Sequence, residues 1–187
     1  VFLRLICLPD ERFRYRKYAP ATSMHPSKAA MIVHCAKPYL RPAANILDPF
    51  CGTGMLLIER AFGGPYKSLY GLDISGPAVQ AAWENGSWAG VNLHLIQRNF
   101  NDFKHEYKFD EIITDMPRGN TKNAGVHADY IYHLLFSRSL ELLAPEGIMV
   151  IYSEDEAVME KKLTENLWLR RLEKISMSRD KSSWLYI

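Results

Sequence analysis

Short apolar runs alternate along the chain with longer amphipathic stretches, and glycine, proline or polar residues separate them. Runs of this kind are typical of buried strands, whereas the amphipathic stretches space their apolar residues as helices do. The pattern predicts helices at about 26–39, 53–62, 75–89, 129–143 and 154–166. It predicts strands at about 45–48, 68–73, 93–97, 111–114, 148–153, 167–176 and 182–187. Strands that alternate with helices indicate a parallel sheet with helices on both of its faces.

The last two predicted strands, 167–176 and 182–187, are joined by a short polar turn, so we expect an antiparallel hairpin at one edge of the sheet. The expected fold is therefore α/β, with a mostly parallel seven-stranded sheet that ends in this hairpin. The arrangement resembles the Rossmann-like fold of class I methyltransferases more than the fold of dehydrogenases.

Composition places the chain among ordinary globular proteins. Its 187 residues are 48% hydrophobic and 24% charged, which suits one domain with a real core. No run approaches the roughly 20 apolar residues that span a bilayer, and no signal peptide is visible, so we expect a cytoplasmic protein without a membrane partner. The three cysteines have no metal-ligand spacing, which predicts reduced thiols and no metal site.

The net charge of +2 is too small to indicate a nucleic-acid binder by itself. The basic residues are nevertheless uneven, and they gather near both ends of the chain: Arg4, Arg12, Arg14, Arg16 and Lys17, then Arg170, Arg171, Lys174, Arg179 and Lys181. Solvated charge and an RNA-facing surface are both open readings of these groups. Because the chain begins with Val1, we expect residues 1–20 to be a linker from an upstream domain and 21–187 to be the catalytic domain.

A glycine turn stands between the first predicted strand of the sheet and the helix that follows it. Residues 48–54 read Asp-Pro-Phe-Cys-Gly-Thr-Gly, and about 20 residues later the second predicted strand ends in Asp73. A strand, a tight glycine turn and a helix start bring backbone amides against a nucleotide-like ligand. An acid at the tip of the second strand is where doubly wound folds hold a ribose diol.

The turn differs from a dinucleotide site in two respects. Gly52 and Gly54 are present, but Leu57 occupies the place of the third glycine. Asp48 adds a carboxylate at the mouth of the turn, which would repel a pyrophosphate and suit a cationic ligand. These differences favour S-adenosylmethionine, which carries a sulfonium and an ammonium group.

Three segments then carry a family resemblance: Ser23-Met24-His25-Pro26, the turn 48–54, and Gly71-Leu72-Asp73-Ile74-Ser75. They resemble RNA methyltransferases of the guanosine-N2 (UPF0020-like) family, which often carry an N-terminal THUMP domain. The resemblance covers about residues 12–187. It implies transfer of a methyl group from S-adenosylmethionine to an exocyclic amine of a base in structured RNA, with guanosine N2 in tRNA or rRNA as the leading target.

The resemblance also implies which residues hold the cofactor. Those near its methionine part and carboxylate would be Ser23, His25, Asp48, Pro49, Phe50, Cys51, Gly52 and Gly54. Asp73 would accept hydrogen bonds from the ribose hydroxyls, and Ile74 would pack on the adenine. Asn99 aligns with the residue that receives the adenine amino group, with Phe100 beside the ring, although the nearby Asp102 is an alternative to Asn99.

The predicted target-base site is Asp115-Met116-Pro117-Arg118, directly after the fourth strand. Amino-group methyltransferases typically have Asp or Asn, two prolines and then Tyr or Phe at this place. The acid or amide and a backbone carbonyl would grip the two amine hydrogens, and the aromatic ring would stack on the base. Arg118 stands where the aromatic residue is expected, and a guanidinium plane can also stack on a base.

Arg118 leaves two other functions open. One is a catalytically silent domain that binds RNA and S-adenosylmethionine or either one, because the base clamp is altered. The other is N6 methylation of adenine in DNA, which uses the same motif logic. We further expect loop 117–128 to be a lid over the target base. Cys51, Trp83 and Trp88 are expected to be packing residues.

Overall fold

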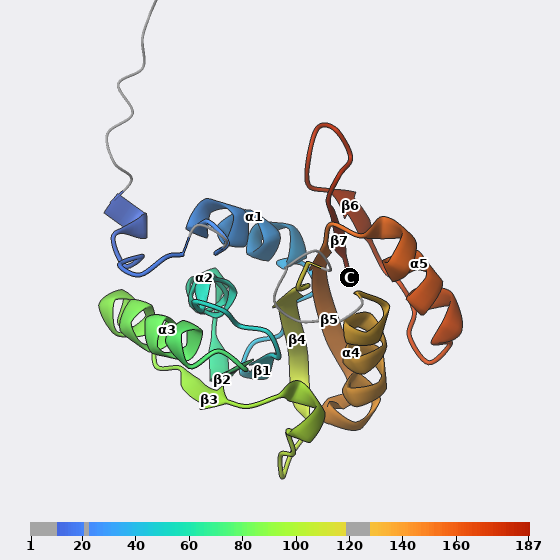
Figure 1. The fold of residues 1–187 in the computed structure, drawn as a ribbon, viewed down its shortest axis with the longest axis horizontal. Coiled ribbons are helices and arrows are strands. Elements are labelled where there is room, and N and C mark those ends of the chain that lie inside the picture. The colour runs from blue at the N-terminus through green and yellow to red at the C-terminus, as the bar shows by residue number, and fades with distance from the viewer. Residues whose placement is uncertain (1–10, 21–22, 119–127) are drawn as a thin grey trace, which may run out of the picture.

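The computed structural model describes residues 11–20, 23–118 and 128–187, and within these ranges seven strands form one sheet (Figure 1). In chain order the strands are β1 (Ala44–Asp48), β2 (Tyr66–Asp73), β3 (His94–Gln97), β4 (Phe109–Asp115), β5 (Leu143–Ser153), β6 (Lys174–Ser176) and β7 (Trp184–Tyr186). The helices are α1 (Pro26–Ala36), α2 (Met55–Gly63), α3 (Gly76–Ala89), α4 (Ala128–Leu142) and α5 (Glu156–Glu165), with 3₁₀ turns η1 (Glu11–Phe13) and η2 (Phe100–Asp102).

The strands lie in the order β3-β2-β1-β4-β5-β7-β6. The first five are parallel, whereas β7 runs antiparallel to both β5 and β6. The predicted sheet and its hairpin at one edge are therefore confirmed. Its strand order reverses at β1, which lies between β2 and β4, and ligands of open α/β sheets bind at such a reversal.

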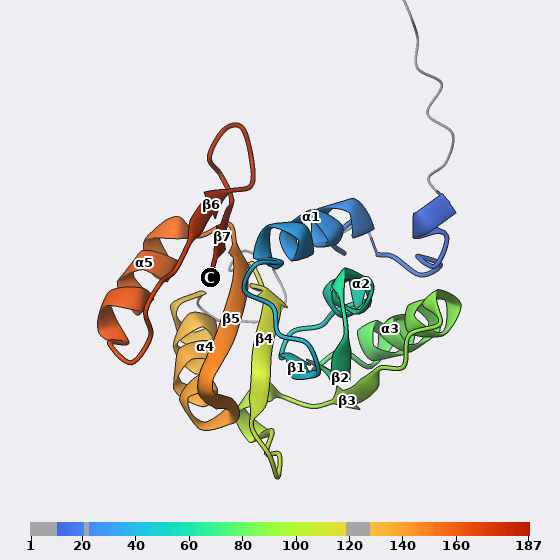
Figure 2. The same cartoon turned by 180° about the vertical axis from the view of Figure 1, so that it is seen from behind.

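Helices α1, α2 and α3 cover one face of the sheet, and α4 and α5 cover the other (Figures 1 and 2). Successive residues of a strand point to opposite faces, so a strand that is covered on both sides is apolar throughout. In β5, Val150 packs in the cluster under α1 and α2, and the next residue, Ile151, packs in the cluster under α4 and α5. The sheet therefore separates two cores.

Two predicted boundaries differ from the structure. The strand expected at 167–176 is only Lys174–Ser176, because apolar residues before it stay outside the core; Leu167 is 90% exposed. The strand expected at 148–153 begins earlier, at Leu143, with a bulge before Ile148, since Leu143 pairs with Phe109 and Ile148 is the next paired residue.

A buried ion pair ties helix α2 to strand β4. Arg60 Nε lies 2.7 Å from Glu111 Oε2, and Arg60 Nη2 donates to Glu111 Oε1 at 2.9 Å. The Arg41 backbone N–H also donates to Glu111 Oε1, at 2.7 Å. The two charged residues are 1% and 0% exposed. This bidentate geometry satisfies the buried charges and fixes how α2 lies on the sheet.

Residues before α1 pack on the same domain. The Tyr15 side chain is buried and its hydroxyl donates to Glu59, while Asn85 Oδ1 accepts hydrogen bonds from the backbone of Lys17 at 2.9 Å and Tyr18 at 3.2 Å. The division at residue 20 stays a prediction. Across the described part of the chain, each helix is too short or too polar to cross a membrane.

Candidate active site

Three acids lie at one edge of the sheet. Asp48 ends β1, Asp73 ends β2 and Asp115 ends β4, and these strands are parallel neighbours. The carboxyl ends of parallel strands meet at the same edge, so the sheet brings together the acids that the sequence singled out. Between them lies the glycine turn that connects β1 to α2.

Hydrogen bonds to β2 hold the glycine turn. The Cys51 N–H donates to the Leu72 carbonyl at 2.8 Å, and the Gly52 N–H donates to Asp73 Oδ2 at 3.0 Å. Gly52 has a φ of +50°, a conformation that favours glycine, and no atom lies within 4 Å of where its Cβ would be. The backbone of the turn is therefore open to a ligand on that side.

The turn also depends on a close approach at Gly71 of β2. A Cβ on Gly71 would lie 2.9 Å from Cys51 Sγ and 2.9 Å from a methyl carbon of Leu95. Cys51 itself is only 6% exposed, which confirms that it is a packing residue. The absence of a side chain at Gly71 thus allows the turn to sit directly against β2.

Asp48 is a buried carboxyl group, 1% exposed. Its Oδ1 accepts hydrogen bonds from the Thr114 hydroxyl at 2.8 Å and from the Phe50 N–H at 3.1 Å. Burial outweighs these bonds and, together with the nearby acids Asp115 and Asp73, raises the pKa of Asp48 to about 8. A cation next to this group would favour its ionised form.

Asp73 and Ile74 follow the end of β2. Asp73 Oδ1 accepts a hydrogen bond from the Ser75 N–H at 2.8 Å, so both carboxylate oxygens are fixed by backbone donors. Each oxygen keeps a second lone pair, which a sugar hydroxyl can use. Ile74 is 68% exposed beside it, an apolar side chain that a flat ring can cover.

The segment before α1 contributes two polar residues. His25 is the N-cap of α1, and its Nδ1 accepts a hydrogen bond from the Ser27 N–H at 3.2 Å. The Ser23 hydroxyl accepts a hydrogen bond from Arg16 Nη2 at 3.1 Å. Pro26 begins the helix, where its missing N–H costs nothing. A helix N-terminus of this kind favours a carboxylate.

The residues after β3 are arranged around η2. Asn99 caps η2, since its Oδ1 accepts a hydrogen bond from the Asn101 N–H at 2.9 Å, and Asp102 is exposed. Phe100 is only 2% exposed and its ring meets Phe50 edge to face at 5.7 Å. Phe100 is therefore a core residue beneath the turn, whereas Asn99, Asn101 and Asp102 are exposed.

Asp115 is surrounded by charged side chains. Burial raises the pKa of Asp115 to about 7, Glu154 raises it as well, and the cations Lys28 and Arg118 lower it. The next residue, Met116, is buried and its N–H donates to the Tyr152 carbonyl at 2.9 Å. This bond ties the end of β4 to β5 and fixes the backbone next to Asp115.

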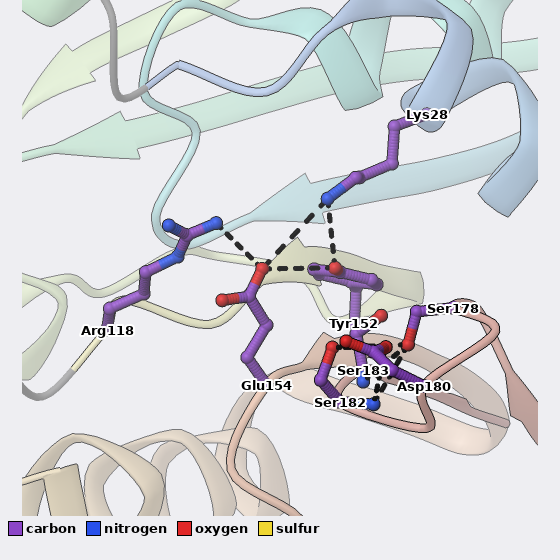
Figure 3. A network of polar contacts seen from close by, with 8 residues as sticks. All are labelled: Lys28, Arg118, Tyr152, Glu154, Ser178, Asp180, Ser182 and Ser183. Carbon is purple, nitrogen blue, oxygen red and sulfur yellow. Dashed lines mark hydrogen bonds and ion pairs between the residues drawn. The ribbon is translucent and has the colours of Figure 1, made fainter.

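Arg118 does not extend freely into solvent. Its Nη2 donates to Glu154 Oε1 at 2.7 Å (Figure 3). The residues 119–127, which contain most of the predicted lid loop, lie outside the described ranges. The sequence motifs did not include Glu154, Tyr152 or Lys28. The available signal was position, because Glu154 directly follows the predicted strand 148–153, as Asp115 follows the predicted strand 111–114.

One packing prediction is wrong. Trp83 and Trp88 on α3 are 58% and 66% exposed, and Lys17 Nζ lies 4.6 Å from the centre of the Trp88 ring. Helix α3 covers the sheet beside α2 with its other face, where Ala82 and Asn85 are fully buried. The two tryptophans therefore lie on the outer surface.

The residues of the edge fit S-adenosylmethionine. Asp48 offers its second oxygen to a cation beside the open backbone at Gly52. The fixed carboxylate of Asp73 suits a ribose, and the exposed side chain of Ile74 suits an apolar ring. Among the described residues, no group of three or more His, Cys, Asp or Glu is placed to hold a metal ion.

Comparison with known proteins agrees with this geometry. Residues 14–182 match the family model described as UPF0020, RMKL-like, methyltransferase domain. The chain is 28% identical over 183 residues to a tRNA (guanine(10)-N2)-dimethyltransferase of Methanothermobacter thermautotrophicus, covering 94% of this chain and 53% of that protein. It is 29% identical over 155 residues to a tRNA1(Val) (adenine(37)-N6)-methyltransferase of Vibrio campbellii, covering 75% and 64%.

Among solved structures, SMU.472 complexed with SAH superposes with a TM-score of 0.72 at 19% identity, over 94% of this chain and 54% of that one. At this identity the likeness shows the class I methyltransferase fold. The chain spans about half the length of the guanine-modifying relative, 53%.

Proposed function

The chain belongs to the RMKL-like methyltransferase domain family, and we propose that it transfers a methyl group from S-adenosylmethionine to an exocyclic amine of a base in structured RNA. Guanosine N2 in tRNA is the leading target, with rRNA as the other RNA to examine. The relatives named above methylate guanine N2 and adenine N6 in tRNA, so both purines are represented among them.

One observation carries this proposal: Asp115, a half-buried acid, lies at the end of β4, on the same edge as the glycine turn. An exocyclic amine is a poor nucleophile because its lone pair is delocalised into the ring. A fixed acceptor beside it, and a methyl donor in line with it, are the two things that the reaction needs. Asp115 and the turn supply places for both.

In this mechanism, S-adenosylmethionine supplies an electrophilic methyl group. Asp73 and the turn around Gly52 orient that donor, and Asp115 accepts a hydrogen bond from the amine. A bond forms between the amine nitrogen and the methyl carbon while the carbon–sulfur bond breaks, and the electron pair stays on sulfur. Asp115 takes the surplus amine proton in its ionised form and returns it to water. Positioning of the two reactants provides most of the rate.

A catalytically silent binding domain is the second candidate, and the contact between Arg118 and Glu154 favours it. A guanidinium held by a carboxylate is less free to stack on a base. Restoring an aromatic side chain by Arg118→Tyr separates the two candidates. Activity that rises in the variant supports a lost clamp, and activity that falls supports a role for the arginine.

Calorimetric titration with S-adenosylmethionine and S-adenosylhomocysteine tests the cofactor site, with Asp73→Ala as the variant and Glu84→Ala, a half-buried position of α3, as the control. We expect micromolar binding to the chain and to the control, and at least tenfold weaker binding to Asp73→Ala, because a ribose hydroxyl would lose a charged acceptor. Transfer of a labelled methyl group to unmodified tRNA and rRNA, followed by nucleoside analysis, tests the reaction. A folded chain that binds neither ligand would contradict the proposal.

A further inference from the structure

Four side chains next to Asp115 form a polar cluster: Lys28, Arg118, Tyr152 and Glu154 (Figure 3). Glu154 Oε1 is its centre. It accepts hydrogen bonds from Arg118 Nη2 at 2.7 Å and from the Tyr152 hydroxyl at 3.2 Å, and Lys28 Nζ lies 4.0 Å away. Lys28 Nζ also donates to the Tyr152 hydroxyl at 3.0 Å.

The contacts that Glu154 makes with Arg118, Tyr152 and Lys28 all use the same oxygen, Oε1. Within the described residues, Oε2 has no hydrogen-bond partner, and Figure 3 shows it on the outer side of the carboxylate. The Glu154 side chain is 33% exposed, so part of it can be reached by a ligand. An ionised carboxylate accepts hydrogen bonds and cannot donate them.

The sheet fixes this cluster beside the target-base residues. Asp115 pairs in register with Tyr152, and Glu154 follows two residues later at the end of β5. Lys28 comes from the first turns of α1, and Arg118 follows β4. A base whose amine reaches Asp115 would therefore present its neighbouring ring atoms to Glu154, Lys28 and Arg118.

The cluster contributes little to stability. Its ion pairs are partly exposed, with side-chain exposures of 63% for Arg118 and 38% for Lys28. Exposed pairs of this kind stabilise a fold only slightly, because water screens the two charges. Its position next to Asp115 is therefore better explained by recognition than by folding.

Guanine and adenine differ at the atom next to the amine. In guanine the ring nitrogen N1 carries a hydrogen, so it donates, and O6 beyond it accepts. In adenine N1 is an acceptor. A carboxylate facing N1 gains a charged hydrogen bond from guanine and meets a lone pair from adenine, which costs energy. Lysine and arginine donors beside it match O6 of guanine.

We propose that Glu154 selects guanine over adenine by accepting a hydrogen bond from N1–H through Oε2, with Lys28 as the donor to O6. Arg118 and Tyr152 hold Glu154 in place for this contact. The proposal rests on the function proposed above. The two named relatives act on different purines, guanine and adenine, and the proposal says that this chain selects guanine.

The test uses the whole chain and unmodified tRNA transcripts with a labelled methyl donor. The guanosine that the wild-type chain methylates is located, and the transcript is made again with 2-aminopurine there. This base keeps the amine at C2, but its N1 carries no hydrogen and it has no O6. We expect the wild-type kcat/KM to be at least tenfold higher for guanosine than for 2-aminopurine, the size of one good base contact.

Glu154→Gln should narrow that preference about tenfold, because a glutamine amide can donate to the bare N1 while its carbonyl still accepts from guanine. Glu146→Gln, an exposed change in the bulge at the other end of β5, should leave the preference unchanged. Thermal melting checks that both variants fold.

An equal loss of kcat/KM on both substrates in Glu154→Gln, with the preference kept, would show that Glu154 only supports the fold of the site and would overturn the inference. A wild-type chain that methylates adenine in RNA would overturn this inference alone, whereas one that methylates no base would overturn the proposed function and this inference together. The two failures are distinguished by the wild-type product alone.

Discussion

At the scale of single residues, the site contains acids whose surroundings oppose their ionisation. Asp48 is buried under the glycine turn and Asp115 is half-buried at the end of β4, and loss of solvent raises the pKa of both. For Asp115 the cations Lys28 and Arg118 oppose this effect, which leaves its pKa at about 7. An acid with such a value changes its charge in the range where enzymes work.

Methyl transfer should therefore follow the ionisation of Asp115. The carboxylate is the competent form, so the single-turnover rate should rise with pH through about 7 and then level off. Below about pH 6 it should fall about tenfold per unit. Asp115→Asn keeps an acceptor oxygen but cannot titrate, so its rate should be lower and flat across this range. A sloping profile in Asp115→Asn would assign the titration to another group.

At the scale of elements, the glycine turn and β2 form one unit. Cys51 and Gly52 are bonded to β2, and Gly71 leaves the space that Cys51 occupies. The turn is thus positioned by the strand that carries Asp73 at its end. Cofactor binding and local packing should respond together to a change in this space.

Gly71→Ala should lower the free energy of unfolding by about 1–3 kcal/mol, because the added methyl group overpacks the contact with Cys51 Sγ. It should also weaken S-adenosylmethionine binding by displacing the turn. Cys51→Ala removes the sulfur, so the double variant should recover part of both losses. Urea unfolding and calorimetry measure the two effects, and strictly additive losses would contradict a direct contact.

Most of the helices and strands, and their order, could be predicted from the sequence. The order of strands and helices follows from apolar periodicity, and the place of Asp48, Asp73 and Asp115 follows from the strand ends. The exposed surface of α3 could not be predicted, because periodicity does not show whether Trp83 and Trp88 have a second layer above them. The strand predicted at 167–176 was too long for the same reason, because periodicity does not show which of its apolar residues are covered.

The cluster around Glu154 also could not be predicted from the sequence. Lys28 and Tyr152 are 124 positions apart and come together only when α1 packs on the sheet. No local spacing records such a contact. A motif identifies residues that are close in sequence, whereas a base-recognition surface gathers side chains from several elements.

At the scale of the whole molecule, the buried ion pair that stabilises the fold and the acids of the candidate site lie toward opposite ends of the parallel strands. Arg60 and Glu111 join α2 to β4 near the segment that leads into β1, and Arg41 adds a third contact there. The acids of the candidate site lie at the carboxyl ends of the strands. The buried ion pair should therefore affect folding far more than binding.

Glu111→Gln should lower the free energy of unfolding by about 3–5 kcal/mol, since it leaves the Arg60 guanidinium buried without a counter-charge. The dissociation constant for S-adenosylmethionine should change less than twofold in the protein that stays folded. Denaturant titration and calorimetry provide the two values. Glu84→Gln, at a half-buried position of α3, is the control and should stay within about 0.5 kcal/mol of wild type.

The burial of Asp48 has a consequence for turnover. A buried carboxyl group whose pKa is about 8 is mostly protonated at neutral pH, and it becomes anionic only beside a cation. The methyl donor arrives with one positive charge more than the product that leaves. Asp48 should thus give up a proton when the donor enters and take one back after transfer. In that cycle the protein should bind the charged methyl donor more tightly than the product that remains after transfer.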